Sequence, residues 1–238
     1  MGVIPTRMFP LGVGHGAPAA QRCVDFAGSA YALNTNVGSW TTANQGSLSM
    51  ALWIWIRALP SSGPVSALTL QPPNVDNGAQ LDPISGATRK FRVLFQGVTI
   101  IGPTSAEVGG IGAWHHYAFS YDYTSKACNA YLDGTQVLSG TPRAWLNASA
   151  TLGVSLGVRN IGIEQGANKL NGKMANVNLY QRAISASEVS ALAAGVGAIP
   201  ADADHQWIFA NDDFADTGTA VTKWNLTGYG NPTFEDVA

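Results

Sequence analysis

The residues from 172 to 195 change hydrophobic period part-way along, and this change constrains the fold more than any other feature of the chain. Residues 172–180 alternate between two faces, which predicts a half-buried strand with one face formed by Met174, Asn176, Asn178 and Tyr180. Ser185 then stands where a helix N-cap is needed, Glu188 three residues later completes a capping box, and Gly195 suits the helix end. The segment therefore predicts a strand, a turn and one short helix.

The other hydrophobic patterns are those of short strands separated by turns. Residues 48–56 are apolar on both faces, which predicts a central strand covered on each side. Asp133-Gly134 predicts a two-residue hairpin turn, and residues 71–88 are predicted to form a long polar loop. Further strands are predicted at 91–95, 98–101, 128–132, 136–138, 151–158 and near 205–209. Strands joined by turns, with a single late helix, favour an antiparallel sandwich or jelly roll.

Several of these segments resemble laminin-G-like domains of the concanavalin A-like lectin/glucanase superfamily. The family's closing strand and helix are matched by Gly172, Tyr180, Arg182, Ala183, Ile184, Ser185 and Glu188. A tryptophan-histidine strand and its hairpin are matched by Trp114–Asp122 and Tyr131–Gly134, and weaker matches are Val24–Gly28 and Ser49–Ile56. The resemblance implies an all-β, two-sheet jelly-roll sandwich with one short helix. It says little about function, because the superfamily holds lectins, hydrolases and structural modules.

The chain is predicted to form one domain preceded by an arm. Residues 1–20 have no strand or helix pattern and carry three prolines, so they are predicted to be an extended N-terminal arm. The arm's candidate anchors for a partner surface are Ile4, Pro5, Met8, Phe9 and Leu11. Residues 21–238 are assigned to the laminin-G-like domain. Residues 196–238 are its returning segment, because about 40 residues cannot easily bury a core of their own.

Composition limits the partners and the compartment. Charged residues make up 12% of the chain and the net charge is −2, so neither nucleic acid nor an anionic membrane is expected as a partner. The N-terminus lacks the uninterrupted apolar core of a signal peptide, and no apolar run is long enough to span a membrane. Without a secretion signal, Cys23 and Cys128 are expected to be buried free thiols rather than a disulfide.

Catalysis and zinc binding are not expected. A glycosidase needs two carboxylates held at a set separation, and the resemblance implies a Glu-x-Asp-x-x-Glu strand that this chain lacks. The protein is therefore predicted not to be an enzyme. His115 and His116 are adjacent in a strand and point to opposite faces, so they cannot chelate one ion. One of them is expected to be packed and the other exposed.

Calcium and glycans are the ligands that the sequence leaves open. The resemblance implies a calcium site on the strand that begins at Gly172, but Ala175 and Asn176 stand where relatives have acids. Weak alternative calcium ligands are Asp212, Asp213 and Asp216, for which the competing interpretation is solvated loop carboxylates. Three tryptophans in polar stretches are candidates for stacking on a sugar, or else for filling a sandwich end or a subunit contact: Trp40, Trp145 and Trp224.

Two functions follow from these patterns. The first is a non-catalytic structural or assembly module, such as a capsid decoration or fibre protein of a virion surface, anchored by residues 1–20 to other subunits, including copies of itself. The second is a carbohydrate- or receptor-binding lectin-like module. The expected location is a virion surface or another extracellular assembly.

Overall fold

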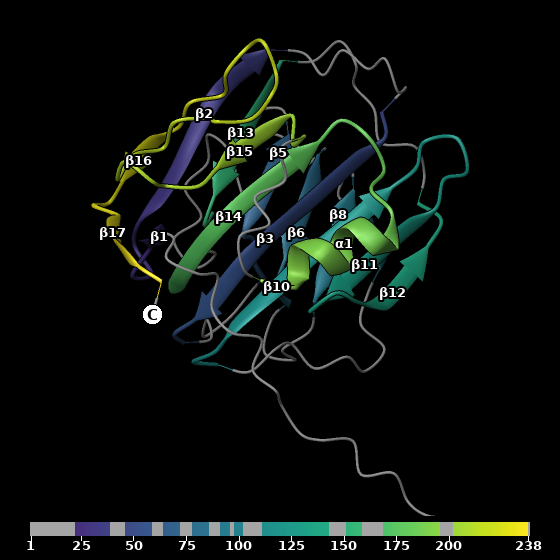
Figure 1. Cartoon of the computed structure of the whole chain (residues 1–238), viewed down its shortest axis with the longest axis horizontal. Coiled ribbons are helices and arrows are strands. Elements are labelled where there is room, and N and C mark those ends of the chain that lie inside the picture. The colour runs from purple at the N-terminus through teal and green to yellow at the C-terminus, as the bar shows by residue number, and fades with distance from the viewer. Residues whose placement is uncertain are drawn as a thin grey trace, which may run out of the picture.

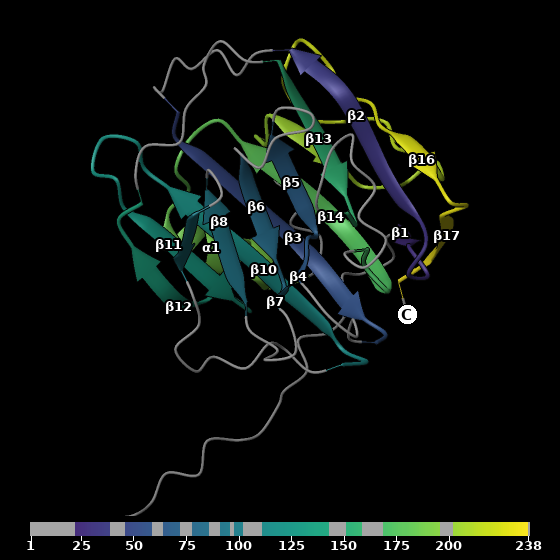
Figure 2. The same cartoon turned by 180° about the vertical axis from the view of Figure 1, so that it is seen from behind.

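Two antiparallel β-sheets pack face to face in the computed structural model of the chain (Figures 1 and 2). The residues described are 22–38, 46–58, 64–71, 78–85, 91–95, 98–101, 111–142, 151–158, 169–195 and 202–237. This architecture confirms the predicted two-sheet jelly-roll sandwich.

The first sheet has eight strands. Its main path, in spatial order, is β12 (Thr135–Gly140), β11 (Cys128–Leu132), β10 (Trp114–Tyr121), β3 (Leu48–Ile56), β14 (Gly172–Tyr180), β1 (Arg22–Asp25) and β17 (Thr233–Asp236). The eighth strand, β15 (His205–Trp207), lies off this path and pairs with β14. The strand predicted for residues 48–56 is confirmed, and it lies between β10 and β14 at the centre of the sheet.

The second sheet has seven strands. In spatial order they are β16 (Thr227–Tyr229), β2 (Tyr31–Gly38), β13 (Leu152–Leu156), β5 (Leu68–Gln71), β6 (Ala79–Asp82), β8 (Arg92–Phe95) and β9 (Val98–Ile101). A separate two-stranded pair joins β4 (Pro64–Val65) to β7 (Ile84–Ser85). The C-terminal residues contribute strands to both sheets, because β16 pairs with β2 and β17 pairs with β1.

The main core lies between the two sheets and takes alternate residues from each strand. In β3 the inward side chains are Leu48, Met50, Leu52, Ile54 and Ile56, and all are buried. They meet inward side chains of the second sheet such as Leu70, Leu81 and Val154. Period-two alternation therefore places one apolar face of each sheet in the core.

The single helix of the described residues, α1 (Ala186–Ala193), covers part of the outer face of the first sheet (Figure 1). The capping box predicted for Ser185 and Glu188 is present in both directions. Apolar side chains of the helix and its flanks pack on the sheet in one cluster, formed by Ala51, Ala118, Tyr131, Tyr180, Ile184, Val189, Leu192 and Ala203. Eight residues are too few for a helix to cross a bilayer, and no described helix is suited to do so.

The alternation predicted for β14 is wrong beyond Ala175. The register with β3 shifts between Ala175 and Asn178, and Asn176 has φ +47°. This bulge inserts one residue, so Met174 and Val177, rather than Met174 and Asn176, face the core. Such a bulge arises from pairing with strands that are distant in the sequence. It therefore cannot be predicted from the alternation of residues within one strand.

The polar loop predicted for residues 71–88 is also corrected. Residues 79–82 form β6 inside the second sheet, with Ala79 and Leu81 in the core. The alternating polar side chains are buried but paired, since Gln80 Nε2 donates to Gln71 Oε1 at 2.8 Å and Asp82 accepts from Ser66 and Arg92. Buried hydrogen bonds between side chains let a polar sequence form an interior strand.

Other local predictions are confirmed. Asp133 and Gly134 have φ of +49° and +77°, as a two-residue hairpin turn requires, and they join β11 to β12. Gly195, after α1, has φ +92°. Cys23 and Cys128 are both free and buried.

Candidate functional site

The C-terminal segment 202–226 builds a compact polar structure beside the end of β14. It first supplies β15 and then doubles back, because the N–H groups of Thr217, Thr219 and Ala220 donate to carbonyls of residues 203–206. A bond from Asn34 Nδ2 to the Asn225 carbonyl, at 2.9 Å, ties the segment to β2 of the other sheet. The segment therefore closes one end of the sandwich.

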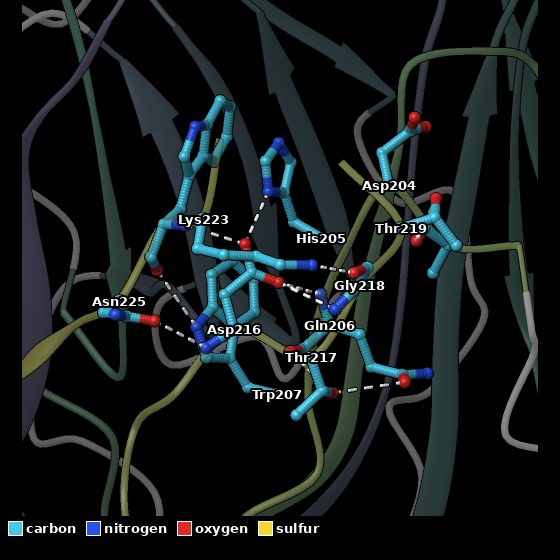
Figure 3. Close-up of polar contacts among 12 residues, drawn as sticks. Asp204, His205, Gln206, Trp207, Asp216, Thr217, Gly218, Thr219, Lys223 and Asn225 are labelled. Atoms are coloured by element: carbon cyan, nitrogen blue, oxygen red, sulfur yellow. Dashed lines mark hydrogen bonds and ion pairs between the residues drawn. The ribbon is translucent and has the colours of Figure 1, made fainter. Parts of the chain in front are cut away.

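The carboxylate of Asp216 organises this segment from a buried position (Figure 3). Its Oδ1 accepts from the N–H groups of Gln206 (3.0 Å) and Gly218 (2.9 Å). Its Oδ2 accepts from the Trp224 N–H (2.8 Å) and lies 2.7 Å from His205 Nδ1. Burial raises the pKa of Asp216, but the hydrogen bonds from His205 and the three backbone N–H groups outweigh it, so the net pKa is lowered.

Gly218 allows this close packing. A Cβ on Gly218 would lie 2.3 Å from the Asp204 carbonyl oxygen and 2.6 Å from His205 Cα, so no side chain fits there. The next turn is closed by Lys223, whose ammonium donates to the Gly218 carbonyl. The conformation of residues 216–224 thus requires glycine at position 218, where the two backbone segments come closest.

The rings of His205 and Trp224 stack face to face within this segment. Their ring centroids are 3.6 Å apart and their planes differ by 14°. His205 is 1% exposed and Trp224 is 4% exposed, so the two rings form a wall rather than an open platform. Trp207 holds the backbone of Trp224 in place, since Trp207 Nε1 donates to the Trp224 carbonyl at 3.2 Å.

The tautomer of His205 follows from its partner. A carboxylate oxygen only accepts, so His205 Nδ1 carries the proton that Asp216 Oδ2 accepts. The other ring nitrogen, Nε2, is turned away from Asp216 in Figure 3 and has no partner among the described residues. In the neutral ring Nε2 is therefore an unused hydrogen-bond acceptor.

A pocket of about 470 Å³ lies over these rings. Its lining comes from the end of β2, the residue after β14, the start of β15 and the loop before Trp224, namely Val37, Gly38, Gln181, Asp204, His205, Ala220, Val221, Thr222 and Trp224. Val221 at the rim is fully exposed. The pocket is open to solvent and combines an aromatic side wall, an apolar residue at the rim and several polar groups.

Among the predicted sugar-stacking residues, Trp224 lines this pocket. Its small exposed fraction and its contact with His205 make it a side wall, with little face left for a sugar ring to cover. Trp40 and Trp145 lie outside the described residues, as does the whole arm with its anchors Ile4, Pro5, Met8, Phe9 and Leu11.

The weak calcium candidates have separate protein partners. Asp216 accepts four hydrogen bonds, Asp212 pairs with Arg22, and Asp213 accepts from the Ala215 N–H. Across the described part of the chain, no group of three or more His, Cys, Asp or Glu side chains is suited to a metal. Calcium binding by these three carboxylates stays a prediction.

The paired histidines lie as predicted on opposite faces. His115 is partly exposed and its Nδ1 lies 2.7 Å from Asp133 Oδ2. His116 is buried against Trp53, with ring centroids 5.4 Å apart.

Asp204, His205 and Gln181 escape prediction from the sequence. Asp204 follows Pro200 and resembles a linker acid, and His205 lacks metal-ligand spacing. A usable signal does exist, because His205 and Trp207 alternate in a strand while Asp216, Gly218 and Trp224 follow in one short polar segment. Nothing in that pattern, however, predicts which side chain pairs with which.

Comparison with known proteins identifies the family. A laminin G family model, described as the concanavalin A-like lectin/glucanases superfamily, matches residues 26–190, more than half of the chain. The chain belongs to this superfamily. None of the curated proteins matches.

Solved structures of superfamily-like sandwiches extend the likeness over most of the chain. A heptameric SAP-like pentraxin from Limulus polyphemus aligns with a TM-score of 0.64 at 12% identity, covering 91% of this chain and 95% of the pentraxin chain. A protein from Bacteroides ovatus that is inferred to bind carbohydrate aligns with a TM-score of 0.62 at 14% identity, covering 92% of this chain and 60% of its own. At such identities the likeness shows the fold alone.

Proposed function

We propose that this superfamily member is a non-catalytic saccharide-binding module and that the pocket beside Trp224 is its binding site. The observation that carries the proposal is the buried His205, whose Nε2 has no partner among the described residues and which lines the pocket. A ligand hydroxyl that enters the pocket can donate to this nitrogen. The carbohydrate-binding inference for the Bacteroides ovatus neighbour supports the same function.

The carboxylates of the pocket favour binding over hydrolysis. Glycosidases use two carboxyl groups, about 5–5.5 Å apart in retaining enzymes and about 6.5–9.5 Å apart in inverting ones. Within the described lining, Asp204 is the sole carboxylate. Asp216 lies behind His205 and accepts four hydrogen bonds, so it is held as a structural anion. An acid and a base facing one bond are thus missing from the described pocket.

A glycan microarray tests the proposal. The parent protein is expected to bind a subset of glycans, and Ala220→Trp, which places an indole inside the pocket, is expected to abolish that binding while the melting temperature stays close to that of the parent. Ala113→Trp is the matched control, because Ala113 is exposed and outside the pocket. Loss of binding in both variants, or in neither, would place the site elsewhere.

The predicted stacking role of Trp40 and Trp145 stays a prediction, and the same array tests it. Trp40→Ala and Trp145→Ala are each expected to weaken glycan binding if their rings stack on the sugar. Unchanged binding in a variant removes that tryptophan from the glycan-contact set.

We propose as a second function that the arm, residues 1–20, attaches the domain to an assembly, of which a virion surface is one kind. The support is the sequence, in which apolar anchors such as Met8, Phe9 and Leu11 lie between prolines in a chain with 12% charged residues. Extended segments with spaced apolar anchors bind in grooves of a partner. Light scattering should give an oligomer for the full chain and a folded monomer for residues 21–238. An unchanged mass after truncation would refute the anchoring role.

A further inference from the structure

The pocket has one charged side chain in its described lining, the carboxylate of Asp204. Its Oδ2 accepts from the Gln181 N–H at 2.6 Å, and its Oδ1 has no partner among the described residues. Asp204 is partly exposed, so Oδ1 is available to a ligand in the pocket. The pocket therefore presents a negative charge and an open acceptor to whatever enters it.

The cations closest in sequence to the lining residues are bound elsewhere. Arg182 follows Gln181, but its guanidinium pairs with Glu188 and Asp202. Lys223 stands between two lining residues, but its ammonium donates to the Gly218 carbonyl (Figure 3). Neither belongs to the described lining, so an anionic ligand would meet Asp204 without a compensating positive charge.

His205 adds a second acceptor to the same wall. With Nδ1–H donating to Asp216, Nε2 of the neutral ring accepts. His205 Nε2 and Asp204 Oδ1 come from adjacent residues at the start of β15, and both residues line the pocket. A ligand that satisfies both must bring donors, such as hydroxyl, amine or amide N–H groups.

We propose that this pocket selects saccharides by charge, so that amino sugars bind at least as well as neutral sugars and sugars that carry a carboxylate bind worst. The proposal rests on the saccharide-binding function proposed above. A ligand ammonium makes a charge-assisted hydrogen bond to Asp204, whereas a ligand carboxylate faces a like charge and two acceptors. The apolar rim at Val221 is the same for all of these sugars, so charge decides among them.

The test uses matched sugars that differ at one substituent. Methyl glycosides of glucose, glucosamine and glucuronic acid, and the corresponding galactose series, are titrated into labelled protein at low salt and at a pH where the amine is protonated. Dissociation constants come from the saturation of backbone N–H shifts. We expect the uronic acid of the binding series to be weaker than its neutral parent by about tenfold or more, which corresponds to 1.4 kcal/mol.

Asp204→Asn separates charge from shape. It keeps the size of the side chain and removes its charge. The readout is therefore the ratio of the dissociation constants of the uronic acid and the neutral sugar within the same variant, and we expect this ratio to fall by about fivefold from its value in the parent protein. Asp122→Asn is the charge-matched control, because Asp122 lies in the turn after β10 and outside the pocket lining. The discrimination should be unchanged in that control.

The outcomes distinguish this inference from the function on which it rests. If neutral sugars bind in the pocket but the uronic acids bind equally or better, charge selection is wrong and saccharide binding stands. If Asp204→Asn leaves the uronic-acid penalty unchanged, the charge that selects is not that of Asp204. If no sugar of either series shifts any pocket resonance, both proposals are wrong.

Discussion

The segment from β14 to α1 and the segment 202–226 lie next to each other but are stabilised by different kinds of contact. In the first, Ser185 and Glu188 cap the helix from three residues apart, and Val189 packs on the sheet below. In the second, three of the four partners of Asp216 lie 8 to 11 positions away, and the Asn225 carbonyl accepts a bond from Asn34 of β2. The helix cap can be predicted from residues close together in the sequence, whereas the pocket forms only when polar groups that are distant in the sequence come into contact.

Asp216→Asn removes the carboxylate that organises the segment 202–226 and is expected to have the largest effect on stability. An amide nitrogen would face buried N–H donors that now point at a carboxylate, and His205 would lose its anion. We expect the free energy of unfolding to fall by about 3–5 kcal/mol, measured by urea denaturation. Asp213→Asn, an exposed neighbour, should change it by less than about 0.5 kcal/mol. A parent-like midpoint for Asp216→Asn would contradict the account of this segment.

His116 tests a buried polar group on the outer face of the first sheet. Burial lowers its pKa to about 4, against a smaller opposing effect of the Asp133 charge. An unfolded histidine titrates near pH 6.5, so the unfolded chain takes up the proton first. Burial of His116 in its neutral form therefore leaves the free energy of unfolding at its full value above about pH 6.5. As the pH falls toward 4, that free energy decreases by about 3 kcal/mol. Urea denaturation of the parent and His116→Gln between these values should show a steeper decline in the parent; equal slopes would assign the titration elsewhere.

Gly218→Ala tests whether the site depends on close backbone approach. The added methyl would meet the Asp204 carbonyl, and we expect a loss of about 1–3 kcal/mol together with weaker glycan binding. Gly112→Ala provides the contrast, since its Cβ would meet nothing within 4 Å although its φ is +79°. It should cost about 1–2 kcal/mol from backbone conformation alone and leave binding intact. Intact binding in Gly218→Ala would show that the pocket tolerates movement of 204 and 205.

Ser185→Ala, in the locally determined segment, is expected to have the smallest effect. The loss of one helix cap costs about 1 kcal/mol, measured by thermal unfolding, and glycan binding should not change. Ser190→Ala, an exposed position within the same helix, should be neutral or slightly stabilising because alanine favours helix. A loss well above 2 kcal/mol for Ser185→Ala would mean that the cap also stabilises structure outside the helix.

The parts of the fold that the sequence predicts are those with short-range signals. The capping box at Ser185, the hairpin turn at Asp133-Gly134 and the apolar alternation of β3 each involve residues within a few positions of one another. The bulge at Asn176 and the buried strand β6 cannot be predicted from local patterns, because both depend on partner strands. In the first case the partner strand sets a register shift, and in the second it supplies hydrogen bonds to Gln80 and Asp82.

The candidate site is predictable only in fragments. Trp224 stands out as an aromatic residue in a polar stretch, and the structure does place it in the pocket. The role of Asp216 cannot be inferred from spacing, because its four partners come from three separate parts of the segment 205–224. Asp204 looks like a linker acid until the return of residues 217–220 brings it to the pocket wall.

Chemical-shift mapping with the glycan that binds most strongly on the array places the site directly. We expect saturable shifts of the Trp224 indole N–H and of the backbone N–H groups of residues 220–222. The indole of Trp53, which packs against His116 on the outer sheet face, should not shift. A glycan that binds with the same affinity while the resonances of Trp224 and residues 220–222 stay in place would contradict the assignment of this pocket as the binding site.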